Sequence, residues 1–424
     1  MKKLPAQHKH FLSNKLVIWT ISFALIGVAT LLMSHAATPA SVIEPEDAAI
    51  TGNAQSITDA TASNGKALQF LATATTGDGI WQQIAPPQIS ADFNNPSNNY
   101  GFNSIVIDPT NSSVLFMGTN YQGLWKSTDK GVTWAKISTG TGANLLDQGR
   151  LWTLAIDPFN HTNLWTTSGY GAGGPLKSTD GGMSWVKIPV GPPTQNDDVY
   201  SIFFDPYTPN HLIMAWHSVW STDGTNSGVT ETTNGGASWI NHPAPSGSNW
   251  AAGNAAWFLD DSHTWLLGSQ NGGIWRTTDS GTTWTKLSSE NITHGGVNSL
   301  VKYGGTYYLA HTSTIAKSTD NGATWTTISS GLPTSYFSMV ATDGTNLYTA
   351  PSFPAGSTFD SANGPWYYQP LSGGSWQSLT NSPNTCYNYS GTGHCNGPVM
   401  AAYDSTNHIG YTVNWLGGVW KIAH

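Results

Sequence analysis

Four aspartates stand in stretches of the sequence that follow no repeating pattern, which sets them apart from most other acidic residues of the chain. They are Asp147, Asp198, Asp223 and Asp360. Two carboxyl groups roughly 5 to 5.5 Å apart, or roughly 6.5 to 9.5 Å apart, can hydrolyse a glycosidic bond with retention or inversion. Sequence does not give these separations. The four are therefore weak catalytic candidates, and solvation of a loop-rich surface explains acidic residues there as well.

Aromatic residues in the same irregular stretches form a second candidate set. The expected ligand-binding residues are Tyr121, Tyr170, Trp220, Trp250, Trp415 and Arg150. Flat rings with an apolar body suit the C–H faces of sugar rings, so several on one rim would make a glycan-binding platform. The alternative is that these rings pack long loops against the body of the protein. Trp152, Trp216 and Trp257 lie within strand-like runs and are expected in the core.

A repeated turn positions both sets, with the pattern [ST]-[ST]-[DN]-x-G-x-[ST]-W. It occurs at residues 127–134, 178–185, 232–239, 277–284 and 318–325, with an incomplete copy at 372–376. We expect the third side chain to cap backbone N–H groups, the glycine to supply a positive φ, and the tryptophan to cover the turn. These structural third residues are Asp129, Asp180, Asn234, Asp279 and Asp320.

Each repeat contains four strand-like runs, called a to d in chain order. In the first repeat they are residues 104–109, 114–119, 124–128 and 133–137, and later repeats begin at 151, 199, 255, 297, 336 and 399. The last repeat stops after run c, and residues 81–84 have the W-x-x-I form of a run d. We therefore predict an all-β fold, a single seven-bladed β-propeller over residues 79–424, whose ring is closed by this N-terminal strand.

Strand order assigns the connections of a propeller to two faces. Connections a–b and c–d share one face, here named the bottom face, and connections d–a and b–c share the other, the top face. Asp108, Asp157 and Asp205 lie in a–b turns, so they join the repeated-turn acids on the bottom face. Both candidate sets fall on the top face, where propellers present loops to ligands.

Charge and composition exclude several classes of partner. Charged residues make up 9% of the chain, and beyond Ala36 there are 12 basic and 24 acidic side chains. A domain this acidic is unsuited to nucleic acid or anionic lipid headgroups. Neither a phosphate-binding loop nor a dinucleotide or metalloprotease motif occurs, so we expect no cofactor and no metal. We expect the protein to be monomeric.

The N-terminal region reads as an export signal followed by a linker. Lysines precede an apolar run at residues 16–33, and Ser34-His35-Ala36 resembles a cleavage site. Residues 1–36 are therefore a signal peptide or, since the run is at the lower limit of spanning length, a membrane anchor. Residues 37–78 are expected to be a linker with one strand. Either fate of residues 1–36 places the remainder outside the cytoplasm, with the membrane contacted only through this segment.

The two cysteines, Cys386 and Cys395, bracket a short loop. In an exported protein this proximity predicts a disulfide. The alternative is a metal site that also uses His394, although two thiols and one imidazole on a short loop make a poor metal cage.

The repeated turn, the I-D-P turn and the strand G-[LI]-W-[KR]-[ST]-T resemble the BNR or Asp-box propeller superfamily over residues 79–424. This superfamily includes sialidases, xyloglucanase-type glycoside hydrolases and the sortilin luminal domain, and the local resemblance is closest to the xyloglucanase type. Sialidases hold a carboxylate with three arginines, whereas this chain has only Arg150 and Arg276. Xyloglucanases join two propellers, each giving one catalytic aspartate. The segment that matches the first aspartate's loop carries Asn120 instead.

Three functions are compatible with this pattern. The leading expectation is an exported propeller that binds polysaccharide or glycan on its top face, related to glycoside hydrolases but without established activity. The first alternative is an active endo-glycosidase of xyloglucanase type. The second is a cell-surface scaffold that binds another protein.

Overall fold

The computed structural model describes two units of the chain, residues 1–75 and 76–424. The described residues are 54–58, 66–70, 80–90, 101–190, 198–217, 219–220, 227–251, 253–293, 296–351, 365–389, 392–395, 397–415 and 417–423. In the first unit, β1 (Ala54–Thr58) pairs antiparallel with β2 (Lys66–Phe70). The region expected to be a linker with one strand thus contains two. Among the described residues, no helix is both long and apolar enough to cross a membrane.

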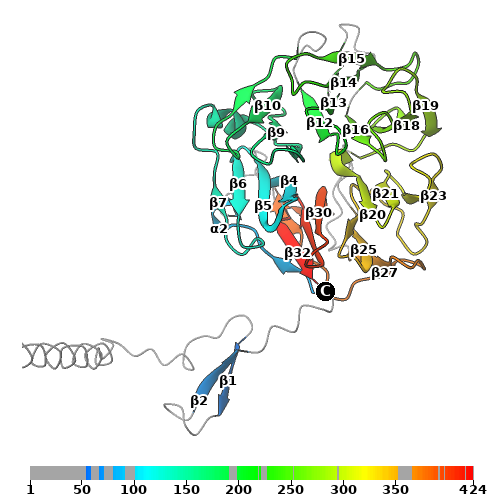
Figure 1. The fold of residues 1–424 in the computed structure, drawn as a ribbon. Helices are drawn as coiled ribbons and strands as arrows, with labels where there is room; N and C mark the ends of the chain where they lie inside the picture. The colour runs from blue at the N-terminus through cyan, green and yellow to red at the C-terminus, as the bar shows by residue number, and fades with distance from the viewer. Residues whose placement is uncertain are drawn as a thin grey trace, which may run out of the picture. The chain divides into compact units, whose positions relative to one another are not determined.

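The second unit is an all-β propeller of seven four-stranded antiparallel sheets, as predicted, counted over the described residues (Figure 1). Blades 1 to 3 consist of β4 (Gly101–Asp108), β5 (Asn111–Asn120), β6 (Leu124–Ser127) and β7 (Ala135–Lys136); β8 (Leu154–Ile156), β9 (Leu164–Thr167), β10 (Pro175–Ser178) and β11 (Val186–Lys187); and β12 (Val199–Phe204), β13 (Leu212–Trp216), β14 (Gly228–Thr232) and β15 (Ile240–Pro243).

Blades 4 to 6 follow the same order along the chain. They consist of β16 (Asn254–Phe258), β17 (Trp265–Ser269), β18 (Gly273–Thr277) and β19 (Thr285–Ser288); β20 (Leu300–Tyr303), β21 (Thr306–Ala310), β22 (Ile315–Ser318) and β23 (Thr326–Thr327); and β24 (Ala341–Thr342), β25 (Asn346–Thr349), β26 (Tyr367–Pro370) and β27 (Gln377–Ser378). The short helices among the described residues are α2 (Pro87–Ser90), η5 (Ala143–Gln148) and η6 (Gly296–Asn298).

Blade 7 combines strands from distant parts of the chain. Its strands are β30 (Met400–Asp404), β31 (Ile409–Val413), β32 (Val419–Ala423) and β3 (Gln82–Gln83), and β3 takes the outer position beside β32. Trp81 packs on Tyr348 and Trp366 of blade 6, with ring centroids 5.4 and 4.9 Å apart. On the other side, the Trp134 indole N–H of blade 1 donates to the Ile84 carbonyl at 2.8 Å. Residues 81–84 therefore contact blades 6, 7 and 1.

The core consists of hydrophobic clusters that lie between neighbouring blades. Trp165 and Ile202, for example, join blades 2 and 3, whereas Ala256 and Trp265 pack with Ile213 across blades 3 and 4. Because a blade is covered on both faces, a middle strand can be apolar along its whole length, as in β13, whose residues are all buried. Each blade therefore depends on its neighbours for burial.

The repeated turns carry the hydrogen bonds predicted for them. The Asp129 carboxylate accepts from the Thr133 backbone N–H at 2.8 Å and from its hydroxyl at 2.6 Å, and the Ser127 hydroxyl accepts from the Gly131 N–H. Equivalent side-chain caps occur at Asp180, Asn234, Asp279 and Asp320. The glycines at the fifth position of the five turns have φ between 72° and 96°, a region in which a Cβ is strained.

The aspartates of the a–b turns also form hydrogen bonds within their own turns. Asp108, Asp157 and Asp205 each accept a hydrogen bond from the backbone N–H two residues later. Asp261, Asp343 and Asp404 do the same in three other blades. A side chain that closes its own turn in this way is a turn former. These six aspartates of the bottom face therefore close their own turns.

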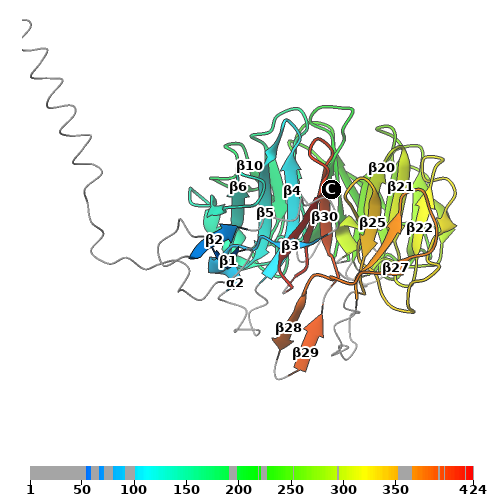
Figure 2. The same cartoon turned by 90° about the horizontal axis from the view of Figure 1, so that it is seen from below.

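The hairpin of β28 (Cys386–Tyr389) and β29 (Thr392–Cys395) is inserted between blades 6 and 7 and projects away from the sheets (Figure 2). Its register places Cys386 opposite Cys395 in the backbone ladder. The side chains of both cysteines lie outside the described residues. The disulfide therefore stays a prediction.

The chain provides its own control for the strength of the turn cap, because blade 3 uses Asn234 where other blades use aspartate. We expect Asp129→Ala to lower the free energy of unfolding by about 1 kcal/mol, as for loss of a helix cap. Asp129→Asn should lose less, since the Asn234 amide bonds both the Ser238 N–H and hydroxyl. Urea unfolding of the three proteins at neutral pH measures this, and equal loss in both variants would contradict the capping role.

The stability difference between the natural chain and Asp129→Asn should depend on pH. Hydrogen bonds from the Thr133 hydroxyl and backbone lower the pKa of Asp129 to about 2, from 3.8 in the unfolded chain. A lowered pKa means that the carboxylate's stabilisation is complete above 3.8 and is lost as the pH falls through about 2. The difference between the natural chain and Asp129→Asn should therefore shrink in acid.

Candidate ligand-binding site on the top face

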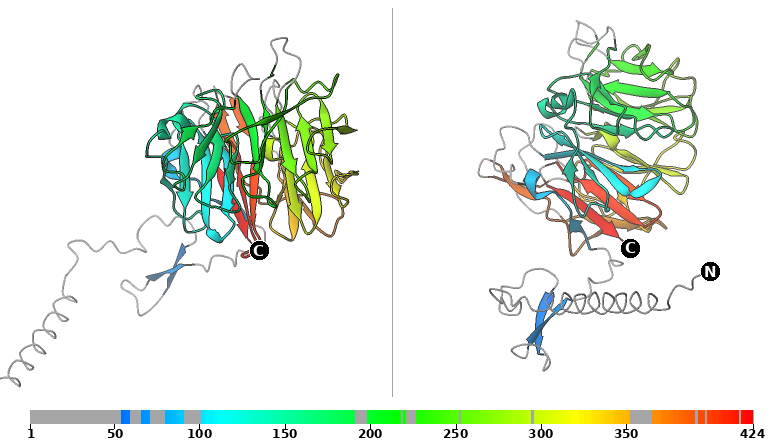
Figure 3. Two further views of the ribbon diagram at one scale, coloured as in Figure 1. Left: turned by 45° about the horizontal axis from the view of Figure 1, so that its top comes forward. Right: turned by 60° about the vertical axis from the view of Figure 1, so that its left-hand side comes forward.

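Five of the residues predicted from sequence come together at one side of the top face. Tyr121 and Trp415 follow the second strands of blades 1 and 7, and Tyr170 lies in the same connection of blade 2. Arg150 and Asp198 precede the first strands of blades 2 and 3. All five positions lie in b–c or d–a connections, which share the top face; the left view of Figure 3 shows the connections at the two ends of the blade strands. We name the group the Arg150 cluster. Its members are Asn120, Tyr121, Arg150, Trp152, Tyr170, Asp198, Tyr200, His217 and Trp415.

Arg150 is held by aromatic rings. Its guanidinium carbon lies 5.1 Å from the ring centroids of Trp152 and Tyr170 and 5.3 Å from that of Trp415. These are cation–π distances. The backbone of Arg150 exchanges hydrogen bonds of 2.8 and 2.9 Å with Gly169, where a Cβ would overlap the Trp152 indole. Burial lowers the pKa of Arg150, and the nearby Tyr170 offsets part of this effect. The group stays cationic, because an arginine loses its proton only far above neutral pH.

A chain of side chains links Asp198 to the exposed Tyr170. The Asp198 carboxylate Oδ2 lies 2.9 Å from His217 Nδ1, and the other ring nitrogen of His217 lies 3.3 Å from the Tyr170 hydroxyl. With Nδ1–H donating to the carboxylate, Nε2 is left to accept from the phenol. Burial raises the pKa of Tyr170 and Arg150 lowers it in turn. The arrangement fixes the hydroxyl of a side chain that is 52% exposed.

Three aromatic residues of the cluster have unusual backbone conformations. Tyr121 and Tyr170 have φ of 59° and Trp415 has φ of 35°. The left-handed region costs a residue with a Cβ roughly 1 to 2 kcal/mol. Such outliers gather at ligand-binding and catalytic sites, where the surrounding structure maintains them. At each of these three positions, the surrounding structure maintains the strained backbone and so places a large ring at the end of a blade.

Polar atoms in the cluster are left without partners. Arg150 Nε, Asn120 Nδ2 and Asp198 Oδ1 are buried and have no hydrogen-bond partner among the described residues. Buried polar groups are almost always bonded, so each exception requires an explanation. Asn120, which stands where the resemblance predicts a catalytic aspartate, is fully buried and bonds to Asn103 through its amide oxygen.

Other predicted residues lie elsewhere. Trp250 is completely buried and packs edge-on against Trp275 and Trp284, at 5.7 and 5.2 Å. Its prediction as an exposed ring is therefore wrong, because the loop that carries it folds back into the core between blades 3 and 4. Trp220 is half-buried and packs on Trp216 at 6.5 Å, so its ring covers blade 3 and does not join the cluster.

The two catalytic candidates that the structure describes, Asp147 and Asp198, have different partners. Asp147 lies in η5 and forms a 2.7 Å ion pair with Lys136, while Asp198 is joined to His217. Asp223 and Asp360 lie outside the described residues. The described part of the chain also contains no group of three or more His, Cys, Asp or Glu that could hold a metal ion.

Sequence reasoning missed His217, Trp152 and Tyr200. Trp152 and Tyr200 were expected only as strand residues, yet their buried rings flank His217 at 6.1 and 5.2 Å. The sequence could have indicated His217, because it directly follows the buried strand β13. By strand register, it occupies the position that Asn120 takes in blade 1. A polar residue there is aimed at the top face.

Stability measurements can separate ligand-facing rings from packing rings in the Arg150 cluster. We expect Tyr170→Ala to lower the free energy of unfolding by less than about 1 kcal/mol, because the ring is half-exposed. Trp152→Ala should lower it by about 3 to 5 kcal/mol, as for loss of a buried aromatic ring. Chemical denaturation of both variants gives the comparison. Equal losses would mean that Tyr170 only packs its loop.

Comparisons with known proteins agree with the predicted resemblance. No protein-family model matches the chain. A xyloglucanase from Paenibacillus sp. is 27% identical over 255 residues, which cover 51% of this chain and 23% of the relative. A xyloglucanase from Hypocrea jecorina is 28% identical over 211 residues, covering 43% of this chain and 25% of the relative. The chain therefore matches about a quarter of the length of these relatives.

Solved structures show the same fold. The GH74 xyloglucanase from Xanthomonas campestris aligns with a TM-score of 0.57 at 14% identity, over 81% of this chain and 53% of that one. YCF48 from Cyanidioschyzon merolae aligns with a TM-score of 0.53 at 14% identity, over 81% of this chain and 98% of that one. At such identities the likeness concerns the fold alone. The chain is thus a seven-bladed β-propeller that resembles the xyloglucanase-type glycoside hydrolases in sequence.

Proposed function

We propose that this protein is an exported, monomeric propeller that binds polysaccharide or glycan at the Arg150 cluster. The observation that carries the proposal is the set of three aromatic residues held at positive φ around one arginine. Strained rings and unpartnered polar atoms in one place support ligand binding more than packing. The similarity to xyloglucanases, whose name specifies a polysaccharide substrate, supports a sugar ligand.

The chemistry of the cluster suits an uncharged sugar chain. The exposed Tyr170 ring offers a face for sugar C–H groups, and its hydroxyl is oriented by His217. Guanidinium N–H groups can only donate, so Arg150 suits hydroxyl oxygens of the ligand, while Asp198 Oδ1, which has no partner among the described residues, can accept a hydroxyl proton. The excess of acidic side chains disfavours polyanionic partners such as nucleic acid. The N-terminal segment would carry the propeller out of the cytoplasm and provide its sole contact with a membrane.

Affinity electrophoresis in gels containing xyloglucan or mixed-linkage β-glucan tests this function. We expect the full chain to be retarded and Tyr170→Ala to lose about tenfold or more in affinity, corresponding to roughly 1.4 kcal/mol. Phe159→Ala is the matched control, since Phe159 is a similarly exposed ring of blade 2 in the a–b turn on the bottom face. No retardation by any neutral polysaccharide, or equal effects of the two variants, would reject the proposal.

A second candidate function is endo-glycosidase activity at the same face. The similarity to xyloglucanases and the presence of Asp198 in the cluster favour it. Asn120 at the expected aspartate position, and the pairing of Asp198 with His217 in place of a second carboxyl, count against it. Release of reducing ends from xyloglucan that stops with Asp198→Asn would establish hydrolysis as the function.

A further inference from the structure

A separate pocket lies between blades 4 and 5, away from the Arg150 cluster. Its volume is about 360 Å³, within the range of small-molecule sites. Blade 4 contributes Ile274, Leu287, Ser288 and Glu290, and blade 5 contributes His311, Thr314, Ala316, Ala323, Thr324, Trp325 and Thr327. One wall is therefore apolar and aromatic, while the other carries hydroxyls, an imidazole and a carboxylate.

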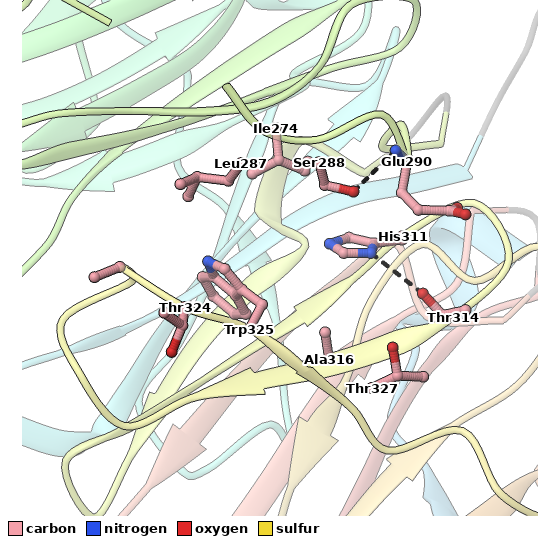
Figure 4. A pocket seen from close by; sticks show the side chains of 11 residues that line it. Ile274, Leu287, Ser288, Glu290, His311, Thr314, Ala316, Thr324, Trp325 and Thr327 are labelled. Carbon is pink, nitrogen blue, oxygen red and sulfur yellow. Dashed lines mark hydrogen bonds between the residues drawn. The ribbon is translucent and has the colours of Figure 1, made fainter. Parts of the chain in front are cut away.

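His311 is the residue that distinguishes this pocket. It is 5% exposed, and its Nε2 has no hydrogen-bond partner among the described residues. Its Nδ1 lies 3.2 Å from the Thr314 hydroxyl, and its backbone N–H donates to the Thr314 carbonyl at 2.8 Å, which fixes the ring. Figure 4 shows the free ring nitrogen turned away from Thr314, on the side of Trp325. A buried polar atom that faces a pocket calls for a ligand group there.

The charge state of the pocket limits what it can bind. Burial lowers the pKa of His311 to about 4, so the imidazole is neutral at physiological pH. Glu290 is held by the Ser313 hydroxyl at 2.8 Å, and it is the carboxylate among the lining residues. The Glu290 carboxylate disfavours anions in the pocket by charge repulsion, and the neutral imidazole supplies no positive charge to offset it. A ligand hydroxyl, by contrast, can either donate to or accept from Nε2, so it satisfies both neutral tautomers of the ring.

We propose that this inter-blade pocket binds a single uncharged sugar ring. The C–H face of the ring would lie against Trp325, Leu287 and Ile274, and its hydroxyls would bond His311 Nε2 and Glu290. The neighbouring pocket between blades 5 and 6 has a volume of about 240 Å³ and lacks a histidine or carboxylate among its lining residues. The pocket between blades 4 and 5 is thus chemically different from the groove that the same repeat makes one blade further on.

The repeats supply matched variants for testing the pocket. Ala323 occupies the sixth position of its turn, where other turns carry the exposed Val132 and Met183, so Ala323→Met should fold and narrow the pocket. Ala237→Met makes the same change in the turn of blade 3, at an exposed residue that lines none of the described pockets. His311→Leu removes the free ring nitrogen.

Isothermal titration calorimetry of the full chain with methyl β-glucoside, methyl β-xyloside and glucuronate tests the inference. Titrations use a Tyr170→Ala background, so that the Arg150 cluster contributes little. We expect saturable binding of at least one methyl glycoside, with glucuronate about tenfold weaker or more. His311→Leu and Ala323→Met should each weaken the glycoside about tenfold, and Ala237→Met should leave its affinity unchanged.

The outcomes are independent of the polysaccharide-binding proposal. Ala323→Met in the natural background should keep its retardation in xyloglucan gels, because the pocket belongs to the outer strands of blades 4 and 5. The absence of saturable binding by all three probes would overturn the inference, as would glycoside binding that Ala323→Met does not weaken, or glucuronate binding as tight as that of the glycosides.

Discussion

The pairing of β3 with β32 is the interaction on which the rest of the structure depends. Gln82 and Gln83 pair with Lys421 and Trp420, and the Ile84 N–H donates to Val419 at 2.8 Å. Since each blade buries its two faces against its neighbours, a ring that failed to close would expose two apolar sheet faces and a strand edge. Trp81 adds buried contacts to blade 6, so a few residues at the start of the propeller connect three blades.

The order of strands within each blade gives the propeller two faces whose connections differ. On the bottom face, the connections are short and regular, and aspartate and asparagine side chains accept hydrogen bonds from backbone N–H groups of these turns. On the top face, the connections vary in length and leave side chains available. Asn120 is the last residue of β5, and His217 and His311 directly follow β13 and β21, so all three lie at the top ends of second strands in three different blades.

Much of the fold was predictable because its signals are local and repeated. The turn pattern fixes hydrogen bonds within eight residues, and the recurrence of the strand-like runs around it gives the number of blades. The chemistry of the top face was harder to predict, since it depends on how irregular loops fold. Trp250 illustrates this limit, because nothing nearby in the sequence shows that its loop returns to the core. Trp152 shows the converse, because it was predicted only as a core ring and is buried, yet it also contacts Arg150.

Contacts between blades were the least predictable part. The chain from Asp198 through His217 to Tyr170 joins residues of blades 3 and 2, and the pocket around His311 lies between blades 4 and 5. The sequence analysis also did not predict the buried Glu231 in blade 3. Its two carboxylate oxygens each lie 2.8 Å from a ring nitrogen, one of His211 and one of His242. Such groupings depend on register between strands, which residue types alone do not determine. The Cys386–Cys395 disulfide, Asp223 and Asp360 remain predictions.

Hydrogen exchange of the full chain with and without a saturating xyloglucan oligosaccharide tests most directly whether the top face binds the ligand. We expect slower exchange in peptides that contain Tyr121, Arg150, Tyr170 and Trp415, because bound ligand would restrain these segments. We expect no change in the capped turns at residues 127–134 and 178–185. Protection of those bottom-face turns, with the Arg150 cluster unaffected, would show that the ligand does not bind the top face.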